Sequence, residues 1–107
     1  ADMLFISAGY DAHFSDPLTT LTLDTQGFYH LAQSLVKLAD QYCHGRVMFV
    51  LEGGYDPQAL KDNIQACLAA LCEQNSYPDH YGKAPGYEAD ISGLITKLIN
   101  RHHLQEK

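Results

Sequence analysis

Residues 46–54 read RVMFVL followed by EGG, and this stretch decides the fold class of the chain. Its apolarity is continuous rather than alternating, which is typical of a strand covered on both faces in a parallel sheet. The two glycines after it permit a sharp turn and a close approach of the backbone to a ligand. The stretch therefore predicts a buried parallel strand that ends in a loop suited to binding.

A second stretch of the same kind lies at residues 3–9, which read MLFI followed by SAG. Between the two runs the sequence predicts a helix that begins after Asp24, a good N-cap residue, and stops at Gly45. Its apolar residues fall on one helical stripe: Phe28, Leu31, Leu35 and Leu38, with Ala32, Val36 and Ala39 beside it. The pair of runs and the helix between them indicate a β-α-β unit.

A second helix is predicted after the second run, where Asp56 supplies an N-cap and Pro57 occupies the first helical position. Its apolar residues are Leu60, Ile64, Cys67, Leu68 and Leu71. Residues 75–87 contain prolines and glycines and predict a loop, and residues from about 88 to 101 have the apolar spacing of a third helix. The whole order is β-α-β-α-α, which is an α/β arrangement.

Three tyrosines punctuate the predicted loop, at positions 77, 81 and 87. Aromatic rings in a loop can stack on nucleobases, but rings that lie on a neighbouring surface of the same protein are the favoured interpretation. The chain has a formal net charge of −6 and no basic cluster. Nucleic-acid binding draws most of its affinity from basic residues on phosphates, so direct nucleic-acid binding is not expected.

The composition is that of an ordinary globular protein, with 46% apolar and 19% charged residues in a chain of 107. No apolar run approaches the ~20 residues of a membrane span, so no membrane association is expected. Three cysteines without a C-x-x-C pair indicate reduced thiols. These features favour a cytoplasmic protein, or a nuclear one if the source is eukaryotic; they leave the oligomeric state open.

Two parallel strands joined by one crossover do not make a stable sheet, because strands apolar on both faces need neighbours and covering helices. The chain should therefore either dimerise through its strand edges or pair with strands outside this sequence. A start at Ala1, without Met and next to an apolar run, favours a piece of a larger domain. The alternative is a small non-catalytic α/β binding or regulatory module, which would show a sheet without open edges.

Asp11 follows the first run closely and should lie near the carboxyl end of the first strand. Ligands bind at that edge of open α/β sheets, so Asp11 could cap a turn, coordinate a metal or position a base. His13 forms a D-x-H pair with it, but one such pair is weak evidence, and an exposed or hydrogen-bonded loop histidine is favoured. Asp16 and Pro17 together indicate a turn.

Tyr55 occupies the equivalent place at the end of the second run, directly before a helix. A phenol there can donate a hydrogen bond to a developing oxyanion, although a tyrosine that merely covers the helix start is the simpler alternative. Consecutive strands are usually neighbours in space. We therefore expect Asp11 and Tyr55 on the same rim of the sheet.

Taken together, SAGYDAH at 7–13, DPL at 16–18 and LEGGY at 51–55 resemble the histone deacetylase superfamily, most closely its class II and bacterial branch. The resemblance covers about residues 2–73 and implies an arginase/deacetylase-like α/β fold. It implies zinc-dependent removal of acetyl groups from acetyl-lysine, in histones or other proteins, or from acetylpolyamines and related acetylated amines. Residues 1–107 would then be the C-terminal portion of one catalytic domain.

The resemblance also implies roles for four residues. Asp11 matches a zinc ligand, Tyr55 matches the tyrosine that hydrogen-bonds the substrate carbonyl, and Gly53 and Gly54 match the backbone that lines the acyl-lysine channel. His13 matches no ligand. The remaining Zn²⁺ ligands and the catalytic histidines are expected upstream, so this segment alone should be inactive. An inactive relative kept for interaction is a third alternative, which the presence of Tyr55 disfavours.

Overall fold

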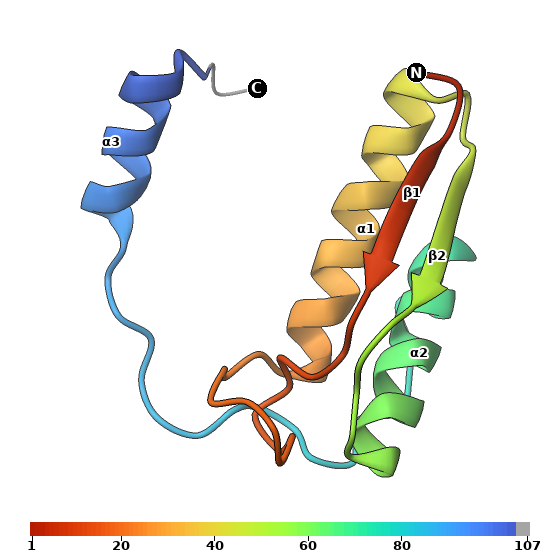
Figure 1. Cartoon of the computed structure of the whole chain (residues 1–107), viewed down its shortest axis with the longest axis vertical. Helices are drawn as coiled ribbons and strands as arrows, with labels where there is room; N and C mark the ends of the chain where they lie inside the picture. Colours follow the sequence, from red (N-terminus) through yellow and green to blue (C-terminus); the bar gives the residue numbers. More distant parts are fainter. Residues whose placement is uncertain (105–107) are drawn as a thin grey trace.

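The computed structural model describes residues 1–104, and its element order confirms the predicted β-α-β-α-α pattern. The elements are β1 (Leu4–Ala8), α1 (Thr25–Tyr42), β2 (Val47–Leu51), α2 (Pro57–Leu71) and α3 (Ser92–His102) (Figure 1). The two strands lie side by side in front of α1 and α2, and α3 stands apart at the end of a long connection.

The strands pair in parallel, in a register that runs from Leu4 opposite Val47 to Ala8 opposite Leu51. Within residues 1–104 the sheet has two strands, so both outer edges are unpaired. Helices α1 and α2 cover one face only (Figure 1). The other face exposes large apolar side chains, those of Phe5, Met48 and Val50. The sequence predicts strands covered on both faces, and the described residues cover one face. The unpaired edges disfavour the alternative of a self-contained module.

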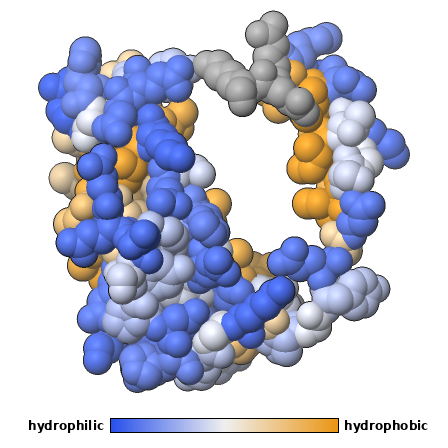
Figure 2. All heavy atoms as spheres, turned by 180° about the vertical axis from the view of Figure 1, so that it is seen from behind, coloured by the Kyte–Doolittle hydropathy of each residue, from blue (hydrophilic) through white to orange (hydrophobic). Residues whose placement is uncertain are grey.

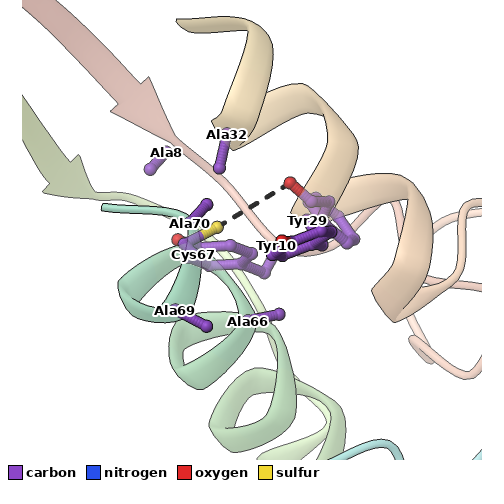
Figure 3. Packing of buried hydrophobic residues seen from close by; sticks show 9 residues of the cluster. Ala8, Tyr10, Tyr29, Ala32, Ala66, Cys67, Ala69 and Ala70 are labelled. Atoms are coloured by element: carbon purple, nitrogen blue, oxygen red, sulfur yellow. Dashed lines mark hydrogen bonds between the residues drawn. The ribbon is translucent and has the colours of Figure 1, made fainter. Parts of the chain in front are cut away.

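The residues that α1 and α2 contribute to the buried cluster are small ones together with Phe28 and Tyr29, and they do not include the leucines of the predicted stripes. Ala32 on α1 and Ala66 on α2 are fully buried, and the alanines let the two helices approach closely (Figure 3). By contrast, Leu31 and Leu68 each keep 53% of their surface exposed. Leu31 borders an apolar hollow next to β1, and Leu68 borders one next to β2. The leucines thus flank the helix interface instead of filling it.

The helix ends follow the predicted signals. The Asp24 carboxylate accepts the Gly27 N–H at 2.9 Å and caps α1. The Asp56 carboxylate accepts two backbone N–H groups and caps α2, whose first residue is Pro57. Gly45 follows α1 with a φ of +74°, a conformation that ends helices and suits glycine. These caps fix where each helix starts relative to the strand end before it.

Helix α3 begins at Ser92, so the predicted start near residue 88 is wrong. Asp90 accepts the Ser92 N–H at 2.9 Å, which holds the chain in a turn up to that point. No residue of α3 is buried, and its apolar stripe faces the gap between the helix and the body (Figure 2). Among the described residues, no helix has the length and apolarity needed to cross a membrane.

Candidate active site

The loops that follow β1 and β2 lie together at the carboxyl edge of the sheet. Beyond the last paired residues, Glu52 N–H donates to the Ala8 carbonyl at 3.0 Å, and Tyr10 N–H donates to the Gly53 carbonyl at 2.8 Å. These bonds extend the strand pairing into both loops. The structure therefore places Asp11 and Tyr55 at the same edge, where the sequence predicts them.

The Asp11 side chain is half-buried, and its carboxylate packs against the backbone of two glycines. A Cβ on Gly53 would lie 3.0 Å from Asp11 Oδ2, and a Cβ on Gly9 would lie 3.2 Å from Asp11 Oδ1. The Thr19 hydroxyl donates to the Asp11 carbonyl and holds its backbone. No donor among residues 1–104 hydrogen-bonds the carboxylate itself, so its lone pairs are available to an external ligand.

Both the backbone conformation and the close packing at position 54 favour glycine. Its φ is +138°, a conformation that residues with a side chain rarely adopt. A Cβ at this position would also lie 3.0 Å from Leu60 Cδ1 and 3.1 Å from Tyr10 Cβ. Gly54 is therefore needed to pack its loop against Tyr10 and Leu60, independently of the substrate-binding role that the resemblance implies.

Tyr55 is held by its backbone and not by its ring. Its N–H donates to Asp16 Oδ2 at 2.8 Å, while the residue keeps 55% of its surface exposed. Next to it, the Ser7 hydroxyl donates to Glu52 Oε1 at 2.7 Å and links the ends of the two strands. The residue is therefore open to solvent at this edge of the sheet, and its catalytic role stays a prediction.

His13 is fully buried, so the alternative of an exposed loop histidine is wrong and the hydrogen-bonded one holds. Its Nδ1 lies 2.8 Å from Ser15 Oγ and accepts the Ser15 N–H at 3.2 Å. Its ring packs on Phe14 and Tyr81, at centroid distances of 4.6 and 5.5 Å. Burial lowers the pKa of the imidazole, although surrounding carboxylates oppose the shift. His13 thus packs the interior of the Asp11 loop.

Residues 77–81, which follow α2, pack against the loops of the candidate site and against α1. The Tyr81 hydroxyl donates to Asp56 Oδ2 at 2.6 Å, and this hydrogen bond is the main reason why the pKa of Asp56 is lowered. The Tyr77 ring packs on Tyr29 with a centroid distance of 4.7 Å. The prediction of rings on a neighbouring surface is therefore confirmed for these two tyrosines. It is wrong for Tyr87, which is 94% exposed.

A buried carboxylate anchors the same segment. Asp62 on α2 is fully buried and accepts the backbone N–H of His80 at 2.8 Å, with the His80 ring 2.9 Å away. Burial alone would raise the pKa of Asp62, but the hydrogen bonds from His80 and Gln58 and the electrostatic attraction of His80 together outweigh it and lower the pKa. Sequence reasoning missed this pair and the Tyr81 bond, because contacts between distant residues leave no local spacing signal.

The described residues can supply one ligand of a metal centre, but they do not form a complete centre. Within residues 1–104, no group of three histidine, cysteine, aspartate or glutamate side chains is arranged to hold a metal ion. A catalytic zinc site needs about three protein ligands. The Asp11 carboxylate has the chemistry of one such ligand, and the remaining ligands would have to come from outside the described residues.

Comparison with known proteins identifies the family. A family model described as "Histone deacetylase domain" matches residues 1–71. The chloroplastic histone deacetylase 14 of Arabidopsis thaliana is 38% identical over 89 residues, which cover 83% of this chain and 21% of that protein. A probable deacetylase of Archaeoglobus fulgidus is 48% identical over 67 residues, which cover 62% of this chain and 19% of that protein.

The fold agrees with that of a solved structure. The crystal structure of the HDA15 HD domain superposes with a TM-score of 0.63 at 26% identity, covering 92% of this chain and 24% of that one. The chain thus spans about a fifth to a quarter of the length of these three proteins. Since the family model matches well over half of its residues, the chain belongs to the histone deacetylase domain family.

Proposed function

We propose that the protein carrying this chain is a zinc-dependent deacetylase, and that this segment supplies part of its catalytic site. The substrate would be the acetyl amide of acetyl-lysine, in a histone or another protein, or of a related acetylated amine. One observation carries the proposal: the two strand-end loops bring the Asp11 carboxylate, the Gly53 backbone and the exposed Tyr55 to one edge of the sheet. Membership of the histone deacetylase domain family supports it.

Each residue has a role that its environment suits. Asp11 would provide one ligand of the zinc ion, because its carboxylate is held against glycine backbone with its lone pairs open. Bound zinc would supply polarisation of the amide carbonyl and a lower pKa for water. Tyr55 would donate a hydrogen bond to the carbonyl oxygen as negative charge develops on it. Gly53 and Gly54 would let the apolar stem of the acyl-lysine pass close to the backbone.

The described residues supply one ligand, so activity is proposed for the full-length protein. They bring a phenol and a carboxylate to one edge of the sheet, but a single carboxylate ligand cannot hold a catalytic zinc ion. We therefore expect this segment alone to be inactive. The missing zinc ligands and the histidines that move protons would be contributed by other parts of the catalytic domain.

The proposal is tested by replacing Tyr55 with phenylalanine in the full-length protein. We expect zinc-loaded Tyr55→Phe to release acetate from an acetyl-lysine peptide with a kcat lowered about a hundredfold or more, because one oxyanion donor is lost. The matched control is Tyr87→Phe, which removes the hydroxyl of a 94% exposed tyrosine and should leave kcat unchanged. Wild-type turnover by Tyr55→Phe would remove this tyrosine from the reaction. No zinc-dependent acetate release by the wild-type protein would refute the deacetylase assignment.

A further inference from the structure

Asp16 is a buried carboxylate whose two oxygens serve two different loops. The residue is 6% exposed. Its Oδ1 accepts the N–H of Leu18 at 2.8 Å, and its Oδ2 accepts the N–H of Tyr55 at 2.8 Å. The first bond is local and explains why an Asp-Pro pair forms a turn here. The second bond spans 39 residues of sequence, and turn formation does not require it.

The long-range bond acts where the backbone most needs support. Tyr55 follows Gly54, which adopts a positive φ that favours glycine. Because glycine is conformationally permissive, the backbone at this point needs hydrogen bonds to hold it. On one side of Gly54, the Gly53 carbonyl accepts the Tyr10 N–H at 2.8 Å. On the other side, the Tyr55 N–H is held by Asp16. Both hydrogen bonds join the Tyr55 loop to the Asp11 loop.

Nothing comparable holds the ring of Tyr55. More than half of the residue is exposed, and within residues 1–104 no side-chain hydrogen bond fixes the phenol. What the described residues fix is therefore the backbone position from which the ring projects. A carboxylate that accepts an N–H forms a stronger bond than a neutral acceptor does, so Asp16 is well suited to fix that backbone.

We infer that Asp16 is a positioning residue, which sets the Tyr55 phenol relative to the Asp11 carboxylate. This inference rests on the proposed role of Tyr55. Asp11 and Asp16 belong to the same loop, so one short segment would both contribute a metal ligand and align the oxyanion donor with it. Small errors in such alignment are costly, since a displacement of about 1 Å can lower a rate about a hundredfold.

The test is Asp16→Asn in the full-length, zinc-loaded protein. Asparagine has a single acceptor oxygen and cannot serve both N–H groups, while its size is unchanged. We expect kcat for acetate release to fall about tenfold with KM within about twofold, because the phenol acts mainly on the transition state. The matched control is Asp24→Asn, since Asp24 also joins two backbone N–H groups, those of Gly27 and Ala84. It should leave kcat unchanged.

A double-mutant cycle separates positioning from a structural role. In the Tyr55→Phe background the phenol is absent, so Asp16→Asn should change kcat by less than about twofold. An equal loss in both backgrounds, or an unchanged kcat in the wild-type background, would overturn the inference. If Tyr55→Phe alone has wild-type turnover, the proposed role of Tyr55 fails first and the inference falls with it.

A second variant covers the case in which Asp16→Asn does not fold. Asp16→Glu keeps both carboxylate oxygens and moves them outward by one methylene, so the same cycle applies to it. We expect a loss of kcat that disappears in the Tyr55→Phe background. If neither variant gives folded protein while Asp24→Asn does, Asp16 is needed for folding itself and the positioning role is rejected.

Discussion

The two loops at the carboxyl edge of the sheet are built in different ways. The loop after β1 closes turns within its own residues and buries His13 completely and Asp16 almost completely, with the Tyr81 ring packed on His13. The loop after β2 is short and exposes Tyr55. It is held largely by hydrogen bonds to the first loop, through Tyr10 and Asp16. The first loop is therefore the reference to which the second is aligned.

This difference separates the two candidate functional groups. The Asp11 carboxylate belongs to the loop after β1 and is packed against Gly9 of that loop and Gly53 of the other. Tyr55 belongs to the dependent loop, so its position is sensitive to changes elsewhere. Changes at the glycines between the loops should distinguish damage to the packing from damage to the proposed zinc ligand.

The largest effect on stability is expected for Gly54→Ala. Alanine would have to adopt a φ of +138° and place its Cβ about 3 Å from Leu60 and Tyr10. Such strain costs on the order of 1–3 kcal/mol, so the free energy of unfolding of the full-length protein should fall by about 2 kcal/mol. Urea denaturation measures this change. Gly86→Ala, at another positive φ but with open space around it, should cost less; equal losses would show that the contacts contribute nothing.

A smaller effect, on activity rather than on folding, is expected for Gly53→Ala. Gly53 has no positive φ, so alanine can adopt its backbone, but the new Cβ would lie 3.0 Å from Asp11 Oδ2. The carboxylate must then move by a few tenths of an ångström, which should lower kcat/KM for acetate release about tenfold while stability changes little. Gly93→Ala, with no atom near its added Cβ, is the control. Unchanged activity in Gly53→Ala would show that the exact place of the Asp11 carboxylate does not matter.

Much of the fold could be predicted because its signals are local. Continuous apolar runs predicted two neighbouring parallel strands, and Asp24 and Asp56 predicted the starts of α1 and α2. The buried helix faces were predicted only in part: Phe28, Ala32 and Cys67 are buried as expected, but Leu31 and Leu68 are exposed. Leucine and alanine stripes run side by side along each helix, and hydropathy favours the leucines. The close approach of α1 and α2 instead buries alanines such as Ala32 and Ala66.

The candidate site shows the same division between local and distant signals. The position of Asp11 and Tyr55 at one edge followed from the strand ends. The support around them did not, because it joins residues that are far apart in sequence. Asp16 looks like an ordinary turn residue, and its bond to Tyr55 becomes visible only once the two loops are together. The bond from Tyr81 to Asp56 is of the same kind.

The most direct test of the division of roles between the loops is the zinc content of two variants of the full-length protein, measured by elemental analysis. We predict that Asp11→Asn weakens zinc binding and loses most of its metal on dialysis, whereas Tyr55→Phe retains the wild-type amount. Asp2→Asn is the control, because Asp2 is exposed at the opposite end of β1 and should not affect zinc. Wild-type zinc in Asp11→Asn, or loss of zinc in Tyr55→Phe, would contradict the account.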